Sequence, residues 1–183
     1  MIRNSLNSYG WVSISLHWIM ALTVFGLFGL GLYMVDLGYY DPWYRSSMDL
    51  HKSVGLILAF VYVLRLIWKQ TQLSPEVIAD KSWQKLAAHL THGLLYLILL
   101  VLMVSGYLIS TADGRSIEVF GLVSVPALPF AFEQQEDIAG EIHWLLAWSL
   151  IILVGIHALA ALQHHFILKD NTLKRMLRPE KAQ

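Results

Sequence analysis

The chain has 183 residues, of which 56% are apolar and 14% are charged, and its formal net charge is zero. This composition is far more apolar than that of soluble domains, so we expect a membrane protein. The chain contains no cysteine, which excludes disulfides, iron–sulfur clusters, cysteine-ligated zinc and covalent haem attachment. Histidine would therefore have to hold any metal. No basic nucleic-acid patch is found, so no nucleic-acid partner is expected.

Four apolar segments are each long enough to cross a bilayer, which takes about 20 helical residues. They are residues 12–36, 51–69, 86–110 and 141–167. The first is too long for the apolar region of a signal peptide, so we expect an uncleaved anchor. The connector 111–140 is expected to form irregular or short amphipathic surface structure. We predict an all-α, integral membrane four-helix bundle in a single domain, residues 1–183.

Basic residues are unevenly divided between the two sides of this bundle. Four spans place both termini on one side, whose nine basic residues are Arg3, Lys69, Lys81, Lys85, Lys169, Lys174, Arg175, Arg178 and Lys181. The other side has three basic residues, Arg45, Lys52 and Arg115, and nine carboxylates. Because cytoplasmic loops are enriched in Lys and Arg, we predict that both termini are cytoplasmic.

Histidines recur at helical spacing in the fourth segment. His143 and His157 are fourteen residues apart, which is nearly four turns and about 21 Å along one face of a helix. His164 continues this stripe about two turns further on. A histidine inside a bilayer is costly and usually faces a partner within the bundle. Two such residues at two depths predict two buried cofactors.

The predicted topology sorts the histidines by depth. His51 and His143 lie near the outer ends of their helices, and His17 and His157 lie at a comparable inner level, so we predict these two pairs. Neutral imidazole suits zinc, copper or iron, but paired histidines between facing helices most favour haem. His92 or His89 remains an alternative to His17 at the inner site.

Two glycines and one arginine support the haem hypothesis. Gly31 and Gly106 would bring bare backbone toward the outer histidine layer and leave room for a flat macrocycle, although glycine is also common in membrane helices for packing. Arg65 lies deep in the second segment, where a cation needs a partner. We predict that it pairs with a propionate of the inner haem. The alternative is that Arg65 extends to the inner headgroups, one turn away near Lys69.

Five short motifs resemble the bacterial cytochrome b561 family. They are S-x-x-x-H-W at Ser13–Trp18, L-H-K-S-x-G at Leu50–Gly55, H-x-x-H at His89–His92, H-H-F at His164–Phe166 and K-D-N-T-L-K-R-M at Lys169–Met176. The chain is more distantly similar to the cytochrome b subunits of nickel–iron hydrogenase and formate dehydrogenase. The resemblance implies a multi-pass protein of the bacterial inner membrane with two b-type haems. By analogy the axial pairs are again His51 with His143 and His17 with His157.

The resemblance also implies a role in a respiratory chain, with electrons moving between a periplasmic redox partner and the quinone pool. Quinone reduction needs protons, and histidine titrates near neutral pH, so we predict a ubiquinone site at His92 and His164. These two residues could instead lie in the interfacial region or bond haem propionates.

Two other functions are also consistent with the sequence. Some relatives of the family are described as superoxide:ubiquinone oxidoreductases. Superoxide is an anion, and the nine outer carboxylates would oppose its approach unless Arg45, Lys52 and Arg115 gather near the outer haem. The non-redox alternative is a haem-free transporter that uses its histidines as proton relays.

Overall fold

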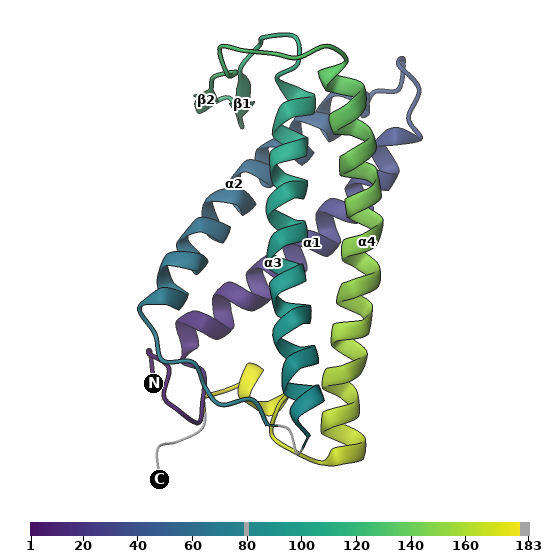
Figure 1. Cartoon of the computed structure of the whole chain (residues 1–183). Coiled ribbons are helices and arrows are strands. Elements are labelled where there is room, and N and C mark those ends of the chain that lie inside the picture. The colour runs from purple at the N-terminus through teal and green to yellow at the C-terminus, as the bar shows by residue number, and fades with distance from the viewer. Residues whose placement is uncertain (79–80, 180–183) are drawn as a thin grey trace. The chain divides into compact units, whose positions relative to one another are not determined.

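The computed structural model describes residues 1–78 and 81–179, so that Lys181, one of the predicted cytoplasmic cations, lies outside the described residues. Its elements in chain order are α1 (Trp11–Val35), α2 (Tyr44–Gln70), α3 (Ser82–Ser110), β1 (Ile117–Val119), β2 (Val123–Val125) and α4 (Gln135–Gln163) (Figure 1). A π-helical turn, His164–Leu168, extends α4, and a 3-10 turn follows at Lys174–Met176. All four long helices are long and apolar enough to cross a membrane, which confirms the predicted four-helix membrane fold.

Three of the four helices begin at least one turn earlier than the sequence predicted. α2 begins at Tyr44 instead of residue 51, α3 at Ser82 instead of 86, and α4 at Gln135 instead of 141. The added turns are polar, and hydrophobicity marks the part of a helix that suits lipid, not the point where helical hydrogen bonding starts. His51 therefore lies about two turns inside α2 and not in its first turn.

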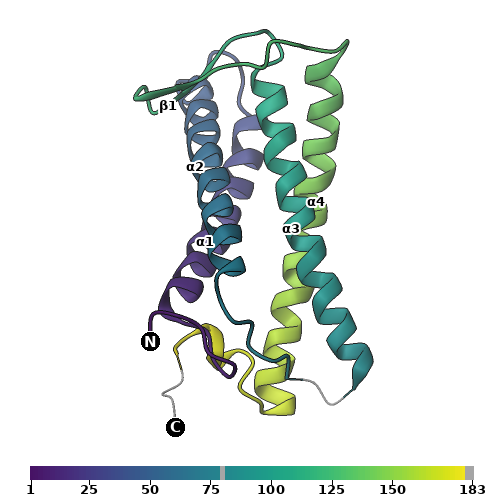
Figure 2. The same ribbon diagram turned by 60° about the vertical axis from the view of Figure 1, so that its left-hand side comes forward.

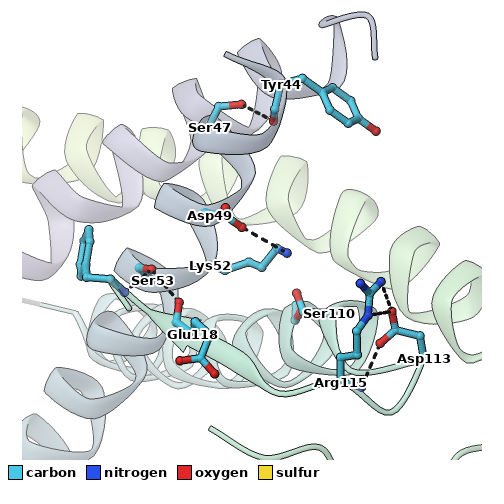
Figure 3. A network of polar contacts seen from close by, with 11 residues as sticks. Tyr44, Ser47, Asp49, Lys52, Ser53, Ser110, Asp113, Arg115 and Glu118 are labelled. Carbon is cyan, nitrogen blue, oxygen red and sulfur yellow. Dashed lines mark hydrogen bonds and ion pairs between the residues drawn. The ribbon is translucent and has the colours of Figure 1, made fainter. Parts of the chain in front are cut away.

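The connector between α3 and α4 contains a β-hairpin that the sequence analysis did not predict. Its strands pair antiparallel, with Ile117 opposite Val125 and Val119 opposite Val123. Gly121 in the turn has φ 68°, a conformation that glycine adopts without steric cost. The buried Ser53 hydroxyl on α2 accepts a hydrogen bond from Phe120 N at 3.1 Å and donates one to Glu118 O at 3.4 Å (Figure 3). These bonds attach the hairpin to α2.

The chain divides into two compact units. Unit 1 comprises Met1–Met20, Val61–Leu97 and Leu150–Gln183, and unit 2 comprises Ala21–Phe60 and Ile98–Ser149. Each long helix therefore contributes one segment to each unit. Within unit 1, the first part of α1 lies beside the turn that follows α4 (Figure 2). Trp18 Nε1 on α1 donates a hydrogen bond to Met176 O of that turn at 2.6 Å. Both ends of the chain belong to unit 1.

The described helices bury few large side chains and expose many. Met20 and Tyr62 are each 3% exposed in unit 1, and Leu58 is 4% exposed in unit 2, whereas Leu22 is 67% and Phe60 65% exposed. Large apolar faces without a protein partner are stable when lipid chains cover them. The exposed faces thus agree with a membrane environment.

Two candidate histidine sites

The first site lies in unit 1 and joins α1, α3 and α4. The ring centres of His17 and His157 are 6.4 Å apart, and the His92 ring lies 5.3 Å from that of His157. His17 and its predicted alternative, His92, are thus both neighbours of His157. His89 is exposed, and its Nδ1 lies 2.7 Å from Lys85 O of its own helix. His89 therefore bonds the backbone of its own helix, α3.

Arg65 on α2 points into this cluster. Its Nη2 lies 3.2 Å from His17 Nδ1, and its Nη1 lies 3.7 Å from the sulfur of the buried Met20. Its guanidinium carbon is 5.6 Å from the ring centre of Tyr96. Among the described residues, no carboxylate forms an ion pair with Arg65. Arg65 thus brings a positive charge to His17 without a protein anion to balance it.

The second site lies in unit 2 and joins α2 and α4. The ring centres of His51 and His143 are 6.2 Å apart. His143 Nδ1 lies 3.0 Å from the Leu102 carbonyl oxygen and 3.2 Å from Ser105 Oγ on α3. A metal-ligating histidine usually donates its second ring N–H to such a carbonyl. This arrangement leaves Nε2 of His143 available as a ligand. In the described structure, His51 Nδ1 is buried without a hydrogen-bond partner.

Two glycines pack directly against the histidines of unit 2. A Cβ atom on Gly31 would lie 3.4 Å from His51 Cε1, and one on Gly106 would lie 3.0 Å from His143 Cε1. At Gly29 and Gly93 the same added atom would meet nothing within 4 Å. The structure thus agrees with the prediction that Gly31 and Gly106 bring bare backbone to the layer of His51 and His143.

The spacing of the histidine rings provides a test of whether they fit a haem. Two imidazoles on opposite sides of one metal ion have ring centres roughly 6 Å apart, because each metal–nitrogen bond is about 2 Å long. The separations of 6.4 and 6.2 Å match this value better than the 5.3 Å between His92 and His157. No group of three or more His, Asp or Glu residues among those described could hold a bare metal ion. The paired imidazoles therefore fit the axial positions of haem iron.

The predicted quinone residues belong to different local networks of unit 1. His92 lies in the His157 cluster, whereas His164 Nδ1 lies 2.5 Å from Asp170 Oδ2 beyond the end of α4. Burial alone would raise the pKa of Asp170, but hydrogen bonds from Thr172 and His164 outweigh it and lower this pKa. Asp170 thus stays ionised and orients His164. Among the described residues, no ring contact or hydrogen bond joins His92 to His164.

Two of the three predicted outer cations pair with neighbouring carboxylates. Lys52 Nζ lies 3.7 Å from Asp49, and Arg115 forms an ion pair with Asp113 (Figure 3). The hydrogen bond from Arg115 lowers the pKa of the Asp113 carboxyl, so this pair stays charged at neutral pH. The local charge of Lys52 and Arg115 is therefore largely balanced.

Sequence reasoning missed several polar residues that support the histidines. Ser105 contacts His143, and Ser13 and Trp68 bond each other beside the His17 site. The sequence could have singled out both serines, because Ser13 belongs to the S-x-x-x-H-W motif and Ser105 precedes Gly106. It could not show their hydrogen-bond partners, because these lie on other helices.

Comparisons with known proteins agree with one another. Residues 8–179 match the family model described as prokaryotic cytochrome b561. The chain is 47% identical to "Cytochrome b561 homolog 2" of Escherichia coli K12 over 175 residues, covering 95% of this chain and 93% of that protein. It is 31% identical to "Probable superoxide oxidase CybB" of Yersinia pestis, covering 92% and 95%, and 30% identical to "Cytochrome b561 homolog 1" of Escherichia coli K12, covering 94% and 98%. The chain therefore belongs to the prokaryotic cytochrome b561 family.

Proposed function

We propose that this protein is a di-haem b-type cytochrome that transfers electrons between the periplasmic face of the bacterial inner membrane and the quinone pool. Membership of the family implies b-type haem. The observation that carries the proposal is the pair of cross-helix histidine contacts, His17 with His157 and His51 with His143, at nearly equal ring separations. These histidines would hold the haems, which would supply one-electron transfer.

His143 and His17 would hold their haems through different hydrogen bonds. Donation from Nδ1 of His143 to Leu102 O would fix the tautomer of the ring and leave Nε2 free to hold the haem iron. The Arg65 guanidinium can only donate, so its contact with His17 requires an unprotonated Nδ1. Coordination through Nε2 would leave the proton of His17 on Nδ1, and two donors would then face each other. Arg65 would then turn to another acceptor, and a haem propionate would supply one, since no carboxylate among the described residues pairs with Arg65.

Replacing Arg65 with leucine should lower either the midpoint potential or the occupancy of the haem held by His17. The reason is that a guanidinium beside a haem propionate offsets negative charge and stabilises the reduced form. Redox titration of the purified protein, followed by visible absorption, measures both quantities. Arg45→Leu is the matched control, since Arg45 is an exposed arginine of the same helix. If neither quantity changes in Arg65→Leu, Arg65 reaches the headgroups instead.

Ubiquinone reduction should slow strongly when His164 or His92 is replaced, if quinone binds at unit 1. His164 is oriented by Asp170 and His92 lies beside His157, so both could pass protons to a reduced quinone. Stopped-flow reoxidation of the reduced protein by a soluble ubiquinone analogue measures the effect in His164→Gln and His92→Gln that retain both haems. His89→Gln, at an exposed histidine of α3, should leave the rate unchanged. Unchanged rates in both test variants would exclude this site.

A superoxide:ubiquinone oxidoreductase is the second candidate function. It is supported by the similarity to the Yersinia pestis protein named as a probable superoxide oxidase. The pairing of Lys52 and Arg115 with carboxylates weakens the positive field that would attract the superoxide anion. Reduction of the purified protein by superoxide at a near-diffusional rate would establish this activity, and a slow reaction would favour a protein or small-molecule donor.

A visible spectrum of the purified protein tests the haem proposal directly. Two b-type haems should give a Soret band and a split α band on reduction. A colourless protein would overturn the proposal and favour the proton-relay transporter. Protease accessibility of the two termini in inverted and right-side-out vesicles would test the predicted cytoplasmic location.

A further inference from the structure

We infer that Asn4, Ser13 and Trp68 form a hydrogen-bonded relay that positions His17 and Arg65 for the haem of unit 1. This inference rests on the proposed function, since it assigns positioning residues to the proposed His17 ligand. All five residues belong to unit 1.

The centre of the relay is the Ser13 hydroxyl on α1. It accepts a hydrogen bond from Trp68 Nε1 of α2 at 3.0 Å and donates one to Asn4 Oδ1 at 2.7 Å. The direction is unambiguous because an indole N–H can only donate. A single hydroxyl therefore links α1 to α2 and to the segment that precedes α1.

This link lies one helical turn from the haem-ligand candidate. Ser13 precedes His17 by four residues on α1, and Trp68 follows Arg65 by three residues on α2. Residues at these spacings share a helix face. The Trp68–Ser13 bond and the Arg65–His17 contact are thus two successive cross-links between the same helices, at 3.0 and 3.2 Å. Two cross-links oppose both sliding and rotation of α1 against α2. The Trp68–Ser13 bond would keep His17 in place even when Arg65 turns to a haem propionate.

Asn4 anchors the relay to the N-terminal strap, which we define as residues 1–10. Its Oδ1 also accepts a hydrogen bond from Gly10 N at 2.9 Å, and its Nδ2 donates to Leu73 O at 3.1 Å. Because Gly10 N can only donate, its partner must be the amide oxygen. Both lone pairs of Oδ1 are therefore used. Asn4 joins the strap, α1 and the segment after α2.

Gly10 provides an independent means of disturbing the strap. A Cβ atom at this buried position would lie 2.2 Å from Ile2 O and 2.6 Å from Arg3 O, both backbone atoms. Backbone cannot yield as a flexible side chain does, so Gly10→Ala should move the strap and with it Asn4. Because glycine has no side chain, Gly10→Ala removes no side-chain contact with Ser13 or Trp68.

The test compares the two haems within one protein. In Ser13→Ala and Trp68→Phe, the low-spin ferric EPR signal of the His17 haem should broaden, and transfer of this haem to excess apomyoglobin should accelerate at least threefold. The signal and transfer rate of the His51 haem should stay as in wild type. Ser13→Thr, which retains the hydroxyl, should restore both properties. Ser47→Ala is the matched control, since within the described part of the chain the Ser47 hydroxyl bonds only Tyr44 O of its own helix.

A second measurement reports the helix register without reference to haem. The chain has no cysteine, so Ser15→Cys on α1 and Ile67→Cys on α2, both exposed, can carry unique spin labels. The distance distribution between the labels should widen when Ser13→Ala, Asn4→Ala or Gly10→Ala is added. An unchanged distribution would overturn the relay, as would equal disturbance of both haems. Two haems retained in His17→Ala would instead contradict the proposed ligand and leave the distance test valid.

Discussion

His17→Ala should reduce the haem content of the purified protein from about two to about one per chain. Under the proposed assignment, the variant would lose one of the two histidines that hold the haem of unit 1, whereas His51 and His143 would still hold the other. The ring separation of 6.4 Å between His17 and His157 is the reason for choosing His17 over His92. The pyridine haemochrome assay, normalised to protein, measures the loss, and the remaining haem should keep the spectrum of the His51/His143 site.

His92→Ala and His89→Ala are the comparison variants for this prediction. Each should retain about two haems, because His89 bonds its own helix and His92 lies nearer to His157 than two axial ligands of one metal would. The opposite pattern, with two haems in His17→Ala and one in His92→Ala, would assign the inner ligand to α3.

Gly106→Val should remove the other haem. The Cβ of valine would lie about 3.0 Å from His143 Cε1, closer than ordinary van der Waals contact, and its two methyl groups would add to the clash. His143 would be driven from the position in which Nδ1 bonds Leu102 O and Ser105 Oγ. Small shifts of a ligand are enough to abolish metal binding. Haem content should fall to about one per chain, with the His17/His157 haem retained.

Gly93→Val is the matched control, because Gly93 lies on the same helix and its added Cβ would meet nothing within 4 Å. It should retain both haems, which separates the contact with His143 from the general effect of valine in α3. Gly31→Ala should lower the haem content less than Gly106→Val does, since the added Cβ would lie 3.4 Å from His51 Cε1. Two haems in Gly106→Val would show that the close backbone approach is not required.

The sequence by itself determined the membrane class, the number of spans and the family. These features depend on long apolar stretches and on short motifs, and both are local properties of the chain. The fourteen-residue spacing of His143 and His157 likewise predicted that they belong to two layers, and the structure places them in different units. The haem ligands and the cytoplasmic termini remain predictions from this same local information.

The tertiary structure decided the features that depend on contacts between distant segments. It added polar turns before the apolar parts of α2, α3 and α4, and a hairpin attached to α2 through Ser53. It directed Arg65 to His17, a contact over 48 positions of sequence, and His143 to Leu102 O over 41. Helical periodicity shows which face a side chain occupies but not which helix faces it. Neighbours across helices are chosen by packing and hydrogen bonding of the whole chain, and only the folded structure shows them.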